Sequence, residues 1–107
     1  MSNEHTDREL LEWAAKAAGH KGTYEPVGIR APAWPWLWNP LANDGDALQL
    51  AVSLNMTLRC YMGNTCAQIG VPGKPNAYCD ETNHADPAIA TRRAIVRAAA
   101  EIGKAMP

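Results

Sequence analysis

The stretch PAIATRRAIVRAAAEIGKA, residues 87–105, is the longest helical pattern in this 107-residue chain. Asp86 stands before it as a capping residue, and Pro87 suits the first helical position because its φ is already fixed near the helical value. At about 100° per residue, the apolar side chains fall in one sector. This sector contains Ala88, Ile95, Val96, Ala99, Ile102 and Met106. The pattern predicts a long amphipathic helix that packs one face onto a core.

The opposite side of this helix is basic. It carries Arg93, Arg97 and Lys104 together with Glu101. These three cations could contact nucleic acid or an acidic protein surface. However, an exposed helix face is normally charged, and no aromatic residue interleaves with these cations to stack on bases. A solvated face is therefore the simpler interpretation.

Arg92 differs from its neighbours because its projected direction lies inside the apolar sector. Its aliphatic stem could lie along apolar surface with the guanidinium in water. Alternatively, it could form an inward ion pair with Asp44, Asp46 or Asp80. We take Arg92 and Asp46 as the candidate buried pair.

Two further helices are predicted upstream. Thr6-Asp7-Arg8-Glu9 is a capping box and Gly19 provides a left-handed stop, so the first helix covers about residues 7–18. Its alanines indicate close packing against a neighbour. Asn43 or Asp44 caps a second helix that ends at Asn55. We expect its broad apolar face to consist of Ala47, Leu48, Ala51, Val52 and Leu54.

The strand signals are weaker. Residues 57–70 read as a hairpin around Gly63-Asn64, since glycine at the first turn position suits a type II′ turn. The corresponding register pairs Met62 with Thr65, Cys60 with Ala67 and Leu58 with Ile69. Residues 71–85 read as a loop.

Four prolines stand between residues 21 and 41, and each lacks the amide donor that a central strand needs. We therefore expect at most an edge strand there, at about residues 27–30. The expected fold is therefore a single α+β domain spanning residues 1–107. In this fold, three helices pack on a small antiparallel sheet.

Composition excludes several classes of protein. Ten basic and eleven acidic residues give a net charge of −1, without the basic excess that drives binding to a phosphate backbone. No apolar run approaches the ~20 residues that span a bilayer. The polar N-terminus does not resemble a signal peptide. We expect no membrane association and a cytoplasmic location, and we consider nucleic acid an unfavoured partner.

Metal and catalytic sites are also weakly supported. Cys60, Cys66, Cys79 and His84 have the residue types of a zinc site, but their spacings do not match those of zinc fingers or ribbons. The predicted hairpin register also sends Cys60 and Cys66 to opposite faces. Cys79 and His84, with Asp80, form no recognisable catalytic motif. We predict no metal, no cofactor and no catalytic residue.

The tryptophan-rich segment before the second helix is the best candidate for binding. Trp34, Trp36 and Trp38 stand in a proline-bracketed run. In an extended chain, alternation sends the three rings to one side and Leu37 to the other. The rings could fold back as core bulk. They could instead form a binding surface, because tryptophan is enriched at interaction hot spots. The candidate protein-binding residues are Trp34, Trp36, Leu37 and Trp38.

Three blocks of the chain resemble a group of small proteins encoded by tailed bacteriophages and prophages of proteobacteria. The blocks comprise residues 6–11 with 14–19, residues 38–41 with 44–48 and 50–52, and residues 90–102. The resemblance brings no catalytic residues with it. Trp38 falls in a matching block and is interpreted as the structural lead into the second helix. Trp34 and Trp36 fall outside the blocks, which makes them the better candidates for binding.

The function that this resemblance implies is an expectation by analogy. We expect a non-enzymatic phage accessory protein that binds a host protein or complex, such as an anti-CRISPR-like inhibitor of host defence. The alternative is a nucleic-acid-associated accessory protein that uses Arg93, Arg97 and Lys104. An enzyme or metal protein that uses Cys79 and His84 comes last. A homodimer formed through the tryptophan segment is also left open.

Overall fold

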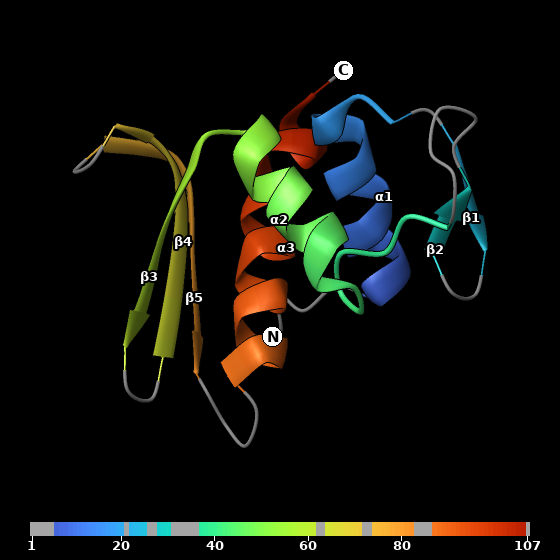
Figure 1. Ribbon diagram of the computed structural model, residues 1–107. Coiled ribbons are helices and arrows are strands. Elements are labelled where there is room, and N and C mark those ends of the chain that lie inside the picture. Colours follow the sequence, from blue (N-terminus) through green and yellow to red (C-terminus); the bar gives the residue numbers. More distant parts are fainter. Residues whose placement is uncertain are drawn as a thin grey trace.

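The computed structural model describes residues 6–20, 22–25, 28–30, 37–61, 64–71, 74–82 and 87–106, with the backbone alone for Thr23 and for the strand residues between 59 and 82. The elements follow one another along the chain (Figure 1). They are α1 (Asp7–Ala18), β1 (Thr23–Glu25), β2 (Gly28–Arg30), α2 (Asp44–Ser53), β3 (Met56–Tyr61), β4 (Asn64–Val71), β5 (Lys74–Thr82) and α3 (Pro87–Ala105). The predicted α+β class is confirmed.

Helix α3 is the central element of the fold. The three-stranded sheet lies on one side of it, α1 lies on the other, and α2 packs across it in the foreground of Figure 1. The small β1–β2 sheet packs against α1. A helix in this position is covered on more than one side, which explains why so many of its small residues are buried.

The prediction of a single apolar sector on α3 is therefore only partly right. Ile95, Val96 and Ala99 are buried as expected, but Ala88 and Met106 are exposed. Two alanines outside the predicted sector, Ala94 and Ala98, are fully buried. They pack against the partly buried residues Leu54, Met56, Leu58 and Ile102. Alanine suits this second covered face because its small side chain lets the sheet come close to the helix.

The first helix begins and ends as predicted. The Thr6 hydroxyl accepts from the Glu9 amide at 3.1 Å, and the Thr6 amide donates to Glu9 Oε1 at 3.1 Å. Gly19 ends the helix with φ 81°, in the left-handed region that favours glycine. The close packing that its alanines predict is also present, since Ala14 and Ala15 are buried in the core.

The second helix begins at the predicted residue but turns a different face inward. Asn43 caps it by accepting from the Asp46 amide at 2.9 Å, and Asn55 follows its end with φ 53°. Its buried residues are Asp46, Ala47, Leu50 and Ala51. The predicted face included Leu48 and Val52, and both of these side chains are exposed. That part of the prediction is wrong.

The β3–β4 hairpin is present, but its predicted register is wrong by two residues. Leu58 pairs with Ala67 and Cys60 with Thr65, and the closing pair is Tyr61 with Asn64. The predicted turn at Gly63-Asn64 falls partly outside the described residues. A shift of two residues preserves the alternation of side chains between faces. The hydrophobic pattern of the sequence therefore could not distinguish the two registers.

The prediction of a loop over residues 71–85 is also wrong, because Lys74–Thr82 forms β5. This strand pairs with β4 in the order β3-β4-β5, so it lies at an edge of the sheet. Pro75 pairs with Gly70 beside an irregularity in the register. A proline is tolerated in a strand at an edge or a bulge because its missing amide is not needed there. The prolines therefore did not exclude a strand.

The predicted edge strand at residues 27–30 appears as β2 over its described part, Gly28–Arg30. It pairs with β1, which the sequence did not predict, in a sheet separate from β3–β5. An ion pair between Glu25 and Arg30 joins the two strands.

Candidate protein-binding surface

Trp38 belongs to the core and not to an exposed contact surface. Its side chain is 0% exposed. Its backbone pairs with that of Ile29, with the Ile29 amide donating to the Trp38 carbonyl at 2.8 Å and the Trp38 amide donating back at 2.9 Å. Its ring lies against His20, with the ring centroids 4.9 Å apart. The prediction that Trp38 binds a partner is therefore corrected, and its interpretation as a structural lead fits this geometry.

The other residues of the predicted tryptophan surface give less information. Leu37 is half-buried. Trp34 and Trp36 lie outside the described residues, so their proposed role in binding stays a prediction.

The chain after Trp38 is held firmly where it enters α2. The Asn39 amide donates to Asp46 Oδ2 at 2.8 Å, and the Leu41 amide donates to Asn39 Oδ1 at 3.0 Å. Asp46 is fully buried in the first turn of the helix, where the positive end of the helix dipole favours a carboxylate. Burial lowers the pKa of the neighbouring His20, while the charge of Asp46 acts in the opposite direction. This polar junction fixes the position of α2.

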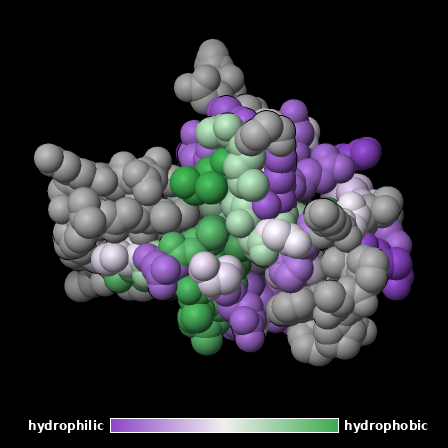
Figure 2. Space-filling view, turned by 90° about the horizontal axis from the view of Figure 1, so that it is seen from above, coloured by the Kyte–Doolittle hydropathy of each residue, from purple (hydrophilic) through white to green (hydrophobic). Residues whose placement is uncertain are grey.

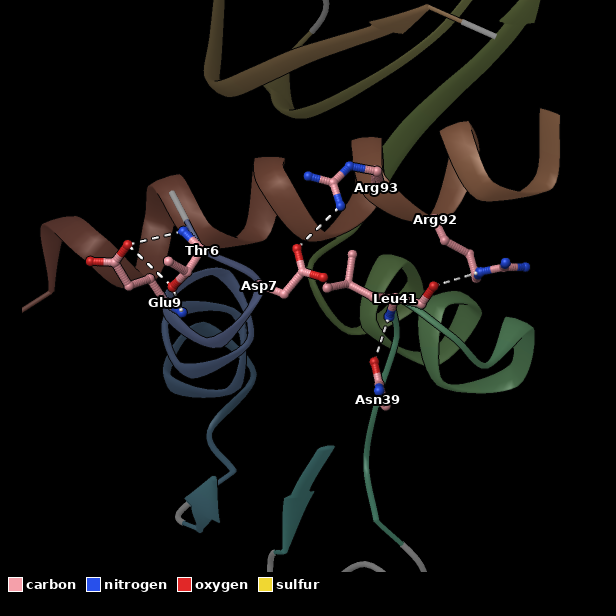
Figure 3. A network of polar contacts seen from close by, with 7 residues as sticks. All are labelled: Thr6, Asp7, Glu9, Asn39, Leu41, Arg92 and Arg93. Atoms are coloured by element: carbon pink, nitrogen blue, oxygen red, sulfur yellow. Dashed lines mark hydrogen bonds and ion pairs between the residues drawn. The ribbon is translucent and has the colours of Figure 1, made fainter. Parts of the chain in front are cut away.

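Arg92 connects the same segment to α3. Its Nε donates to the Leu41 carbonyl at 2.9 Å (Figure 3), and its Nη1 lies 2.6 Å from Asp44 Oδ1. The Arg92 side chain is only 17% exposed, whereas that of Asp44 is 81% exposed. Arg92 therefore pairs with the exposed Asp44, and the prediction of a buried ion pair between Arg92 and Asp46 is wrong. The reason is that Asp46 turns inward to accept from the Asn39 amide.

The predicted basic face of α3 is largely occupied by contacts with neighbouring residues. Arg93 Nη1 lies 3.3 Å from Asp7 Oδ1 at the start of α1 (Figure 3). Lys104 lies over the Trp13 ring, 5.6 Å from its centroid, and 3.8 Å from Glu101 Oε2. Arg97 is exposed. Arg93 and Lys104 both contact α1. A binding role for Arg93, Arg97 and Lys104 stays a prediction.

The exposed apolar residues of α2 make a different surface. Leu48 is 61% exposed and Val52 is 64% exposed, and they lie one turn apart on the same helix. Asp44 precedes them by one turn, so the ion pair with Arg92 lies at one end of this row. Figure 2 shows hydrophobic residues gathered in a band over the helical part of the molecule. We call Leu48 and Val52 the α2 outer face.

A signal for this outer face was present in the sequence but was not recognised. The apolar residues of the second helix are Ala47, Leu48, Leu50, Ala51, Val52 and Leu54. At 100° per residue they cover an arc of about 200°, twice the width of an ordinary buried stripe. A helix at the surface cannot bury so wide an arc. Leu50 is buried in the core, at 1% exposed, whereas Leu48 and Val52 stay exposed to solvent.

The cysteines come from neighbouring strands. In the register of the sheet, Cys60 pairs with Thr65, Cys66 pairs with Arg59 and Asp80, and Cys79 pairs with Ala67. Their side chains and His84 lie outside the described part of the structure. Among the described side chains, no group of three His, Cys, Asp or Glu residues is arranged to hold a metal ion.

Comparison of the chain with protein-family models, curated proteins and solved structures finds no match. Among the described residues, no helix has the length and hydrophobicity needed to cross a bilayer.

Proposed function

We propose that this protein is a non-enzymatic binding module and that the α2 outer face is part of its contact surface. The observation that carries the proposal is the exposure of two branched aliphatic side chains, Leu48 and Val52, on adjacent turns of α2. Large contiguous patches of exposed apolar surface are typical of interaction sites, whereas scattered single apolar residues need no explanation. We take Leu48 and Val52 as the described part of such a patch.

The way α2 is held supports this proposal. Asn43 caps the helix, Asp46 binds the Asn39 amide, and Arg92 ties Asp44 and the Leu41 carbonyl to α3. A helix that is already rigid loses little conformational entropy when a partner binds, so more of the contact energy appears as affinity.

The energy available at this face indicates the kind of interface. Complete burial of an exposed leucine or valine side chain contributes about 1.5–3 kcal/mol. With roughly 60% of each side chain still exposed, the pair could contribute about 2–4 kcal/mol, which is the scale of an interaction hot spot. Micromolar affinity requires about 8 kcal/mol, so other residues would have to contribute. Trp34 and Trp36 remain our candidates for that contribution.

The proposed partner is a host protein or protein complex in the cytoplasm of a bacterial host. The resemblance to proteins of tailed phages supports this choice, and inhibition of a host defence system is the role we favour. A second copy of the chain is a weaker candidate. It is weaker because the resemblance to phage proteins favours a host partner. Either partner would also have to contact residues beyond Leu48 and Val52, since a specific interface buries about 1,200–2,000 Å² in total.

The test is affinity capture from host lysate, followed by measurement of Kd with the identified partner. Three proteins would be compared with the wild type: Leu48→Gln with Val52→Gln, Trp34→Ala with Trp36→Ala, and Ile89→Gln. Ile89 is a matched control because it is an exposed aliphatic residue, at 47%, on another helix. Circular dichroism would establish that each variant is folded.

We expect the Leu48 and Val52 variant to bind at least about 30-fold more weakly, from a loss of about 2 kcal/mol or more. The Ile89 variant should bind like the wild type. A folded Leu48 and Val52 variant with unchanged Kd would refute the role of the α2 outer face. Sedimentation of the wild-type protein would detect a homodimer, which this variant should dissociate if the second copy is the true occupant.

A further inference from the structure

We draw no further inference here: the strongest candidate, the cluster of His20, Trp38 and Asp46 packed between the end of α1 and the start of α2, belongs to the junction already described, and no described contact indicates a ligand or a movement that protonation of His20 would control.

Discussion

Replacing Gly103 by alanine should destabilise the protein, although alanine favours a helix more than glycine does. Gly103 is buried in α3 where that helix crosses α1. A methyl group at this position would overlap the Trp13 carbonyl oxygen and would lie 2.6 Å from the carbonyl carbon and 3.0 Å from the Trp13 Cα. These are backbone atoms, so a change of side-chain rotamer cannot relieve the overlap.

The magnitude follows from these distances. Carbon atoms in contact normally lie about 3.5–4.0 Å apart, so α1 would have to move by roughly 1 Å. Overpacking costs about 3 kcal/mol here, at the upper end of the usual range, because the clash is with backbone atoms. The higher helix propensity of alanine stabilises the helix by about 1 kcal/mol and offsets part of this cost. The net loss of stability is therefore about 2 kcal/mol, which corresponds to a fall in Tm of about 8–16 °C for a domain of this size.

The assay is urea and thermal unfolding followed by far-UV circular dichroism, with Gly45→Ala as the matched control. Gly45 also lies in a helix, but a Cβ there meets only Asn43 Oδ1, at 3.2 Å. Its replacement should change stability by less than about 1 kcal/mol, and in the favourable direction if Asn43 adjusts. A Gly103→Ala protein as stable as the wild type would show that α1 and α3 do not approach as closely as the structure indicates.

Three further predictions concern the junction around α2. Arg92→Met should lower the free energy of unfolding in urea by about 1–2 kcal/mol, because it removes the hydrogen bond to the Leu41 carbonyl while Asp44 stays in water. A loss above about 3 kcal/mol would instead imply that a buried charge had lost its partner. Trp38→Ala should lower the free energy of unfolding by about 3–5 kcal/mol, because the indole is fully buried. Trp38→Phe keeps a ring against His20 and should lower it less, so its Tm should lie between those of Trp38→Ala and the wild type. Burial lowers the pKa of His20 in the folded state, so its contribution to stability should be complete above about pH 6.5 and should decline as the pH falls toward the folded pKa. His20→Gln should flatten the slope of unfolding free energy against pH in that range, and an unchanged slope would assign it to other groups.

The helix ends and the three-stranded sheet show how far local sequence signals reach. The ends of α1 and the start of α2 were predicted because the Thr6–Glu9 capping box, Gly19 and Asn43 act on backbone groups only a few residues away. The hairpin register was missed because two pairings that differ by two residues present the same faces. Strand β5 was missed because a proline that excludes a central strand does not exclude an edge strand.

The candidate surface shows the same division. The residues alone show that the apolar side chains of the second helix span a wide arc and that Arg92 projects into the apolar sector of α3. The packing of the helices in three dimensions sets the rest: Leu50 turns inward, Leu48 and Val52 stay exposed, and Asp44 rather than Asp46 contacts Arg92. The physical reason is that helix periodicity is a property of one segment, whereas burial and ion pairing depend on which other segments pack against it. In this chain the deciding partner is α3, which reaches α2 from about fifty residues further along the sequence.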